Sequence, residues 1–234
     1  MRFSSHRDFQ RAFERALRRS AIPMAYSAGF SPHPKVSYAG AAATGVASEA
    51  EYLEIAVTQR CDPDRVRDAL DASLPPGLDV LEVVEAGPGA LADRLEASVY
   101  EITLPGVQPG LAGAAVDAFL ASSSVTVERM TKNGVRTFDA RAAVLSVDLR
   151  GGPVDATPEL PASVADSAAA DGCAILRVVV RHTTPAVRPD DVLLALRRVA
   201  DLAPPLPPSV TRLAQGPLNA ASDDVADPLV PDRR

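Results

Sequence analysis

Apolar residues recur at helical spacing near the start of the chain. Phe9, Phe13 and Leu17 fall four residues apart, so a helix over this segment carries them on one face. Ser5 is a favoured N-cap residue, and Pro23 ends the helix because proline disfavours helical geometry in the residue before it. A second stripe of the same helix, off the apolar face, consists of Arg7, Arg11, Arg15 and Arg18.

The pattern then changes to short extended runs. Residues 36–38 and 52–57 predict strands, because they combine aromatic or β-branched residues with alternating polar positions. Asp62 and Pro63 predict the start of a second helix, since aspartate caps a helix and proline fits its first turn. Residues 78–84 predict a further strand. The order in this half is therefore helix, strand, strand, helix, strand.

A similar order recurs after a stretch rich in Gly, Pro and Ala. Within it, Asn133-Gly134 predicts a hairpin turn, because both residues tolerate positive φ. We expect strands at residues 99–104, 125–129, 143–149, 175–180 and 209–213, and helices at 112–121 and from 188 onward.

Two of the predicted helices share a sequence pattern. Residues 63–70 and 189–196 both read P-D-x-V-x-x-A-L, and each is followed by two prolines and an extended run. We interpret this as an internal duplication, although any helix can begin with Pro-Asp and carry Val and Leu on one face. The expected fold class is α+β, with two tandem ferredoxin-like (βαββαβ) lobes, the first lacking its first strand.

The same pattern predicts where the lobes begin and end. The first lobe covers residues 1–86, residues 87–97 form a linker, and the second lobe covers residues 98–216. Residues 151–172, rich in Ala, Pro, Asp, Ser and Gly, are expected to form a flexible insert. Residues 217–234 are expected to form a disordered acidic tail.

Charge is distributed unevenly along the chain. The 234 residues carry a net charge of −6, yet residues 1–40 hold seven basic and two acidic residues, a local charge of +5, which leaves −11 for the rest. This distribution favours a local anion-binding patch over a whole-surface polyanion binder. No apolar run approaches the roughly 18 residues of a membrane span, and the N-terminus has no hydrophobic signal region. We therefore expect a cytoplasmic protein without a membrane partner.

The sequence motifs of several enzyme classes are absent. The chain has no Walker loop and no GxGxxG, GxSxG or HExxH motif. Cys61 and Cys173 lack metal-binding spacing, and His6, Asp8 and His33 are not spaced like the ligands of a zinc site. We therefore expect neither a metal nor a cofactor.

One loop is chemically richer than its surroundings. Residues 26–40, YSAGFSPHPKVSYAG, place His33 between Pro32 and Pro34, and Gly29 can supply a positive φ. Two interpretations stay open. The loop is a rigid connector from helix to strand, or it is a binding site whose prolines lower the entropy lost on binding. Its candidate site residues are Tyr26, Ser31, His33 and Lys35.

The basic stripe also has two interpretations. It is a solvated helix face, or it is a surface for an anion or RNA, to which the planar guanidinium of arginine is suited. The chain has no Trp, and no predicted strand has the aromatic pattern of an RNA recognition motif. Contacts with the RNA backbone are therefore expected rather than base stacking on a sheet, and no DNA partner is expected.

The segment RFSSHRDFQRAFERALRRSAIPMAYSAGFSPHPKVSYAGAAATGVASEAEYLEI, residues 2–55, closely resembles the start of the radical-SAM-linked domain of unknown function. That domain occurs free-standing, as in actinobacteria, or fused behind a radical-SAM protein. Weaker similarity extends to RTFDARAAV, RPDDVLLAL and RLAQG. The resemblance implies a basic strand ahead of RFSSHRD, and hence a protein that starts upstream of Met1. The alternative is that another strand fills this edge of the first lobe.

The resemblance also implies association with a radical-SAM protein in an RNA- or ribosome-related pathway. A radical-SAM enzyme holds its iron–sulfur cluster with a CxxxCxxC motif, which this chain lacks, so a partner would carry any radical chemistry. Our hypothesis is a non-catalytic accessory protein that recognises RNA or another anionic partner. One alternative is a metal-independent RNA-processing enzyme with His33 as general acid or base and Lys35 stabilising charge; another is a structural assembly factor. The expected binding residues are Arg7, Arg11, Arg15, Tyr26, Ser31, His33 and Lys35.

Overall fold

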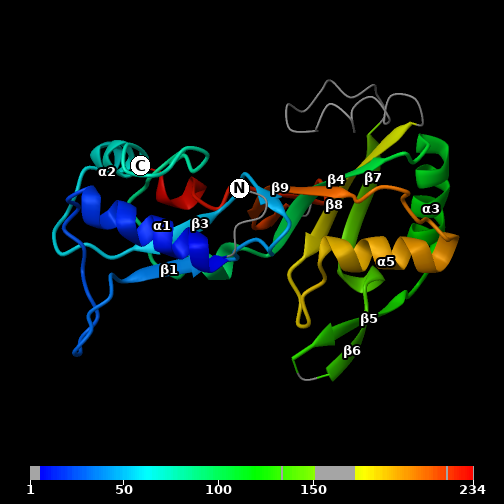
Figure 1. Ribbon diagram of the computed structural model, residues 1–234, viewed down its shortest axis with the longest axis horizontal. Helices are drawn as coiled ribbons and strands as arrows, with labels where there is room; N and C mark the ends of the chain where they lie inside the picture. The colour runs from blue at the N-terminus through cyan, green and yellow to red at the C-terminus, as the bar shows by residue number, and fades with distance from the viewer. Residues whose placement is uncertain (1–5, 133, 151–171, 220, 234) are drawn as a thin grey trace. The chain divides into compact units, whose positions relative to one another are not determined.

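The structure, a computed structural model, describes residues 6–132, 134–150, 172–219 and 221–233 (Figure 1). It is mixed α+β, as the sequence predicts. The chain forms two compact units. The first unit consists of residues 1–95 and 227–234, and the second unit consists of residues 96–226.

The first unit builds a small sheet beside two helices. Its two-stranded antiparallel sheet places Val36 opposite Ile55 and Ala39 opposite Tyr52. The strands expected at residues 36–38 and 52–57 are thereby confirmed to within two residues. The elements of this unit are α1 (His6–Arg19), β1 (Val36–Ala39), β2 (Ala47–Ser48), β3 (Tyr52–Ile55), α2 (Pro63–Asp71), and the 3₁₀ helices η1 (Leu91–Arg94) and η3 (Val230–Asp232).

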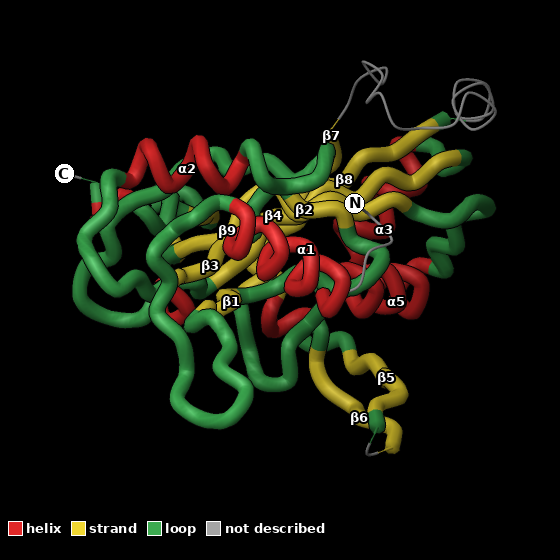
Figure 2. The backbone as a smooth tube through the Cα atoms, turned by 60° about the vertical axis from the view of Figure 1, so that its left-hand side comes forward, coloured by secondary structure: helices red, strands yellow, loops and turns green. Residues whose placement is uncertain are grey.

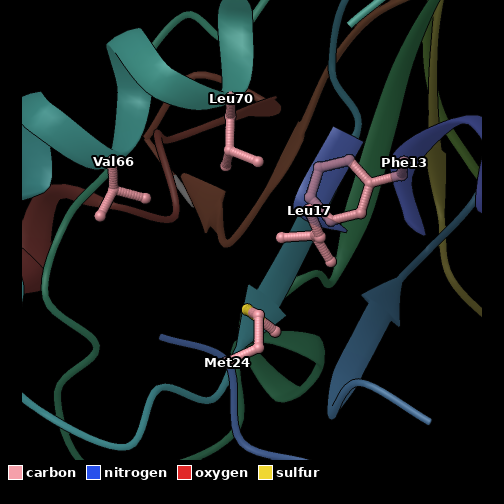
Figure 3. Close-up of a cluster of buried hydrophobic side chains, with 5 residues drawn as sticks. All are labelled: Phe13, Leu17, Met24, Val66 and Leu70. Atoms are coloured by element: carbon pink, nitrogen blue, oxygen red, sulfur yellow. The ribbon is translucent and has the colours of Figure 1, made fainter. Parts of the chain in front are cut away.

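The apolar stripe of α1 forms the core of the first unit together with α2. Figure 3 shows five side chains from α1, α2 and the segment between α1 and β1 that point toward one another. All five are at most 7% exposed, so water is excluded from their contact. They are Phe13, Leu17, Met24, Val66 and Leu70.

The helix α2 begins as its sequence predicts. Asp62 lies in extended geometry before it, and its carboxylate accepts a hydrogen bond from the backbone N–H of Asp64 at 3.0 Å. Pro63 occupies the first turn, where its missing N–H costs no intrahelical bond. Val66 and Leu70 are the buried residues of this helix.

The strand expected at residues 78–84 is not formed, because the structure assigns this described segment to no strand. Part of the segment does pack on the core, since Val80 and Val83 contact the buried cluster while Leu81 is 78% exposed. The backbone N–H of Val80 donates to the Asp71 carboxylate at 2.8 Å, so a side chain satisfies this amide. The apolar residues of this segment therefore reflect packing on the core rather than pairing in a sheet.

The second unit contains a four-stranded antiparallel sheet in the order β9-β4-β8-β7. The chain order of these elements is strand, helix, strand, strand, helix, strand, which is the ferredoxin-like split βαβ arrangement. A hairpin of β5 and β6 is inserted between α3 and β7. The elements are β4 (Ala97–Pro105), α3 (Pro109–Ala121), β5 (Thr126–Thr131), β6 (Gly134–Asp139), η2 (Arg141–Ala143), β7 (Val144–Arg150), β8 (Cys173–Arg181), α5 (Pro189–Ala200) and β9 (Ser209–Gly216).

The repeated pattern P-D-x-V-x-x-A-L adopts the same structure twice. It begins α2 in the first unit and α5 in the second. The Val and the Leu of the pattern are buried in both copies, as Val66 and Leu70 in α2 and as Val192 and Leu196 in α5. The helix geometry thus agrees with the interpretation of an internal duplication.

The end of the chain differs from the expected disordered tail. Leu218–Asn219 (β10) and Asp224–Val225 (β11) form an antiparallel pair in the second unit, and η3 belongs to the first. Arg177 donates to the Asp224 carboxylate at 2.7 Å. The aspartates of this region therefore form ion pairs that composition alone does not reveal. The flexible insert expected at residues 151–172 lies, apart from Gly172, outside the described residues.

Candidate functional site

The helix α1 presents arginines to solvent along one stripe. Arg7, Arg11 and Arg15 are exposed, while the opposite face is buried in the core. Steps of four residues advance about 6 Å along a helix and turn it by about 40°, so the three guanidinium groups span about 12 Å on one side. We call these three residues the arginine ridge.

The ridge carries unbalanced positive charge. Within the described residues, no acidic group forms an ion pair with Arg7, Arg11 or Arg15. Glu14 lies on the same helix, but it pairs with Arg18 at 4.0 Å. Arg19 is engaged elsewhere, because it donates a hydrogen bond to the backbone carbonyl of Ser73. The ridge is therefore the part of α1 that is available to an external anion.

The loop after α1 is a hairpin rather than an irregular connector. Tyr26 and Pro34 form a β-bridge, as do Met24 and Val57 next to it. Within the hairpin, the backbone N–H of Ser27 donates to the carbonyl of His33 at 2.9 Å. The N–H of His33 returns a bond to the Ser27 hydroxyl at 3.0 Å. We call residues 24–35 the N-terminal hairpin.

The base of the N-terminal hairpin is bonded to the residues directly after β3. Lys35 donates its N–H to the carbonyl of Ala25 at 2.9 Å, and Ala25 donates to Ala56 at 2.8 Å. Ala56 in turn donates to the carbonyl of Lys35 at 3.0 Å. Figure 1 and Figure 2 show the hairpin extending below β1 as a separate projection. The rigid-connector and binding-site interpretations of this loop are thus compatible, because a fixed base supports a protruding tip.

The N-terminal hairpin exposes residues of several chemical types, from Tyr26 and Lys35 near its base to Ser31 at its tip. Ser31, His33 and Lys35 are exposed, and Tyr26 is 48% exposed. Phe30, at the very end of the hairpin, is fully exposed. Phe30 was not among the site residues predicted from the sequence, although it stands outside every apolar stripe, directly after Gly29 and before Ser31-Pro32. That isolation within a turn is the signal that could have identified it.

The predicted site residues fall into two groups. The hairpin brings Tyr26, Ser31, His33 and Lys35 together, and α1 aligns the ridge. Among the described residues, no hydrogen bond or ion pair joins one group to the other. Both groups belong to the first unit.

The other histidines do not add a metal site. The side chain of His6 lies outside the described part of the structure. His182 bonds through Nε2 to the hydroxyl of the buried Ser98 at 2.8 Å, as a structural contact at the end of β8. In the described ranges, His, Cys, Asp and Glu nowhere cluster in a group of three that could hold a metal ion.

The helices are also unsuited to a bilayer. Over the part of the chain that the structure describes, none of them has both the length and the apolar character needed to cross a membrane.

A comparison with known families shows which family the chain belongs to. A family described as an uncharacterized protein conserved in bacteria (DUF2344) matches residues 1–189. The chain belongs to this family. The match includes the ridge and the N-terminal hairpin, and it ends at Pro189, the first residue of α5. No curated protein matches the chain.

Proposed function

We propose that this protein is a non-catalytic recognition protein that binds RNA through the arginine ridge and the N-terminal hairpin. It would do so on behalf of a separate radical-SAM protein. The observation that carries the proposal is the exposure of Arg7, Arg11 and Arg15 on one stripe of α1 without an acidic partner among the described residues.

The spacing of the ridge favours a polymeric anion over a single small one. Guanidinium groups that advance by about 6 Å per step can each contact a different phosphate of one strand. Arginine suits this role because its planar fork forms two parallel hydrogen bonds with phosphate oxygens.

The sequence that follows Glu14 has no competing acidic groups. No Asp or Glu occurs between Glu14 and Glu49, a stretch that contains Arg15, Lys35 and the whole N-terminal hairpin. This segment therefore carries a net positive charge, although the full chain is acidic. RNA binding at one face fits this distribution better than binding over the whole surface.

The link to a radical-SAM protein comes from the resemblance of residues 2–55. Cys61 and Cys173 are the only cysteines, and they stand too far apart in the sequence to supply a CxxxCxxC motif. A partner would therefore hold the iron–sulfur cluster, and this chain would deliver or position the RNA. This division of roles makes the protein an accessory factor rather than an enzyme.

The decisive experiment reverses two charges of the ridge. We expect the double variant Arg7→Glu/Arg11→Glu to bind a fluorescein-labelled single-stranded RNA about 10- to 100-fold more weakly than the wild type at low salt. The slope of log K against log salt should decrease by about 0.7 for each phosphate that the variant no longer neutralises. Fluorescence anisotropy measures both quantities.

A matched control separates local contacts from net charge. Arg60 and Arg65 are exposed in the same unit, and Arg60→Glu/Arg65→Glu changes the net charge by the same amount. This variant should retain most of the affinity. Equal losses in the two double variants, or no loss in the ridge variant, would contradict the proposal. Metal-independent cleavage of the RNA that disappears in His33→Ala would replace it with the enzymatic alternative.

A further inference from the structure

We infer that the tip of the N-terminal hairpin is a stacking platform for the unpaired bases of single-stranded RNA, with Phe30 as the stacking residue. The inference rests on the proposed function, and it names the class of RNA and the second mode of contact. The ridge would contact phosphates, and the hairpin tip would contact bases.

The exposure of Phe30 sets it apart from the other aromatic residues. Phe13, Phe119 and Phe138 are at most 9% exposed, whereas Phe30 is fully exposed. Phe9 belongs to an aromatic group, since its ring centroid lies 6.1 Å from that of Phe13. A fully exposed phenylalanine contributes nothing to the core, so its side chain is free to pack against a ligand.

The hairpin holds Phe30 in place before a ligand arrives. Two hydrogen bonds between Ser27 and His33 close the hairpin just behind the tip. Gly29 adopts a φ of +126°, a conformation that a side chain would strain, and Pro32 fixes the backbone on the other side. Because the backbone at Phe30 is already fixed, less conformational entropy is lost when its ring stacks on a base.

The N-terminal hairpin contains Lys35 and no acidic residue, which favours a polyanionic ligand over a protein pocket. His33 and Lys35 are exposed on the same hairpin, and no acidic residue occurs in its sequence or for more than ten residues on either side of Phe30. An apolar protein pocket has no need for this one-sided charge. A ligand with flat apolar groups on a polyanionic backbone does need both features, and single-stranded nucleic acid has that chemistry.

The accessibility of base faces favours single strands over duplexes. Bases in an A-form duplex are stacked on one another, so their faces are not accessible to a protruding ring. Unpaired bases can leave the stack and place one face on Phe30, and each such contact contributes to affinity without strong sequence preference.

The test compares two oligomers of about twelve nucleotides that carry the same number of phosphates: oligo(A) and a fully abasic strand. We expect the wild type to bind oligo(A) about 5- to 150-fold more tightly than the abasic strand. Phe30→Ala should lose this preference and bind both strands as the wild type binds the abasic one. Phe30→Trp should retain the preference, because tryptophan also stacks.

Control variants and strands make the outcome specific. Leu81→Ala removes another exposed apolar side chain of the first unit and should change neither affinity. Equal binding of the two strands by the wild type would overturn the stacking role while leaving the ridge proposal intact. An unchanged preference for oligo(A) in Phe30→Ala would also overturn the stacking role. The same holds if the wild type binds a blunt RNA duplex as tightly as it binds oligo(A). If the wild type binds neither strand at about 50 mM salt, the proposed function itself fails.

Discussion

The two units of the protein are stabilised in different ways. The second unit buries the inner faces of a four-stranded sheet against its helices, and Ile102, Leu104 and Leu176 are 0% exposed. The first unit has a two-stranded sheet, and fewer of its described hydrophobic residues are buried. A two-stranded sheet is marginal by itself, so the first unit depends on further contacts.

The C-terminal segment supplies such contacts. The Asp232 carboxylate, 6% exposed, accepts hydrogen bonds from Arg94 at 2.6 and 3.2 Å and from the backbone N–H of Gly87 at 3.0 Å. Arg94 also donates to the carbonyl of Pro228 at 3.1 Å, and Leu229 packs beside the buried residues of η1. A Cβ at Gly87 would collide with the Asp232 carboxylate, so glycine is required there.

The second unit also contains an arginine–aspartate ion pair that attaches a segment outside its main sheet. Arg129 of β5 and Asp191 of α5 form an ion pair at 2.5 Å, and the Arg129 guanidinium lies 5.0 Å from the ring centroid of Phe138. These contacts secure the inserted β5–β6 hairpin, which lies outside the four-stranded sheet. In both units, ion pairs therefore add to the apolar contacts that hold segments outside the main sheet.

The largest expected effect comes from the core of the second unit. Phe119 is 0% exposed on α3, and Phe119→Ala should lower the free energy of unfolding of this unit by about 3–5 kcal/mol, because it removes packing and leaves a cavity. Urea titration followed by hydrogen exchange at the amides of β4 and β8 measures the loss. The amides of α1, in the first unit, should lose less protection. An equal loss of protection in both units would contradict the expected difference between them.

The C-terminal anchor is expected to have the next largest effect. Asp232→Ala should destabilise the first unit by about 2–3 kcal/mol, because it removes the acceptor of three hydrogen bonds and leaves Arg94 without its carboxylate. Increased hydrogen exchange in α1 and α2 is the readout. Asp64→Ala removes an exposed ion pair with Arg67 and should cost less than about 1 kcal/mol. Similar losses in the two variants would show that burial of the anchor is unimportant.

Much of this fold follows from local pattern. The helices α2 and α5 begin at Pro63 and Pro189, and the strands β4, β7, β8 and β9 lie where apolar alternation predicts them. These elements are identifiable because capping chemistry and periodicity are properties of neighbouring residues. The segment at residues 78–84 differs, since its apolar residues pack on a core without forming a paired strand.

Long-range charge pairing is the part that sequence alone does not give. Arg94 and Asp232 are separated by 138 residues, and nothing in the acidic composition of the last residues indicates a buried carboxylate. The candidate site was also only partly predictable from the sequence. The arginine stripe follows from helical spacing, whereas the full exposure of Phe30 depends on hydrogen bonds that close the hairpin behind it.

The smallest expected effect concerns the alkaline stability of the first unit. Tyr38 of β1 packs edge-on against both Phe9 and Phe13, whose ring centroids are 6.0 and 6.4 Å from its own. Burial, and then the negative charge of Glu14, raises the pKa of Tyr38 to about 12. In the unfolded chain a tyrosine loses its proton near its ordinary pKa of about 10. Between these values the folded state binds more protons than the unfolded state, so the stability due to Tyr38 falls as pH rises.

The variant Tyr38→Phe isolates this contribution, because phenylalanine keeps the ring and lacks the titrating hydroxyl. The difference in free energy of unfolding between wild type and variant should be constant below about pH 9 and should shift against the wild type toward about pH 11.5. Urea titrations at these two pH values measure it. A difference that does not change with pH would mean that the phenol is solvated in the folded state, and the first unit would then be packed even more loosely around β1 than its two-stranded sheet suggests.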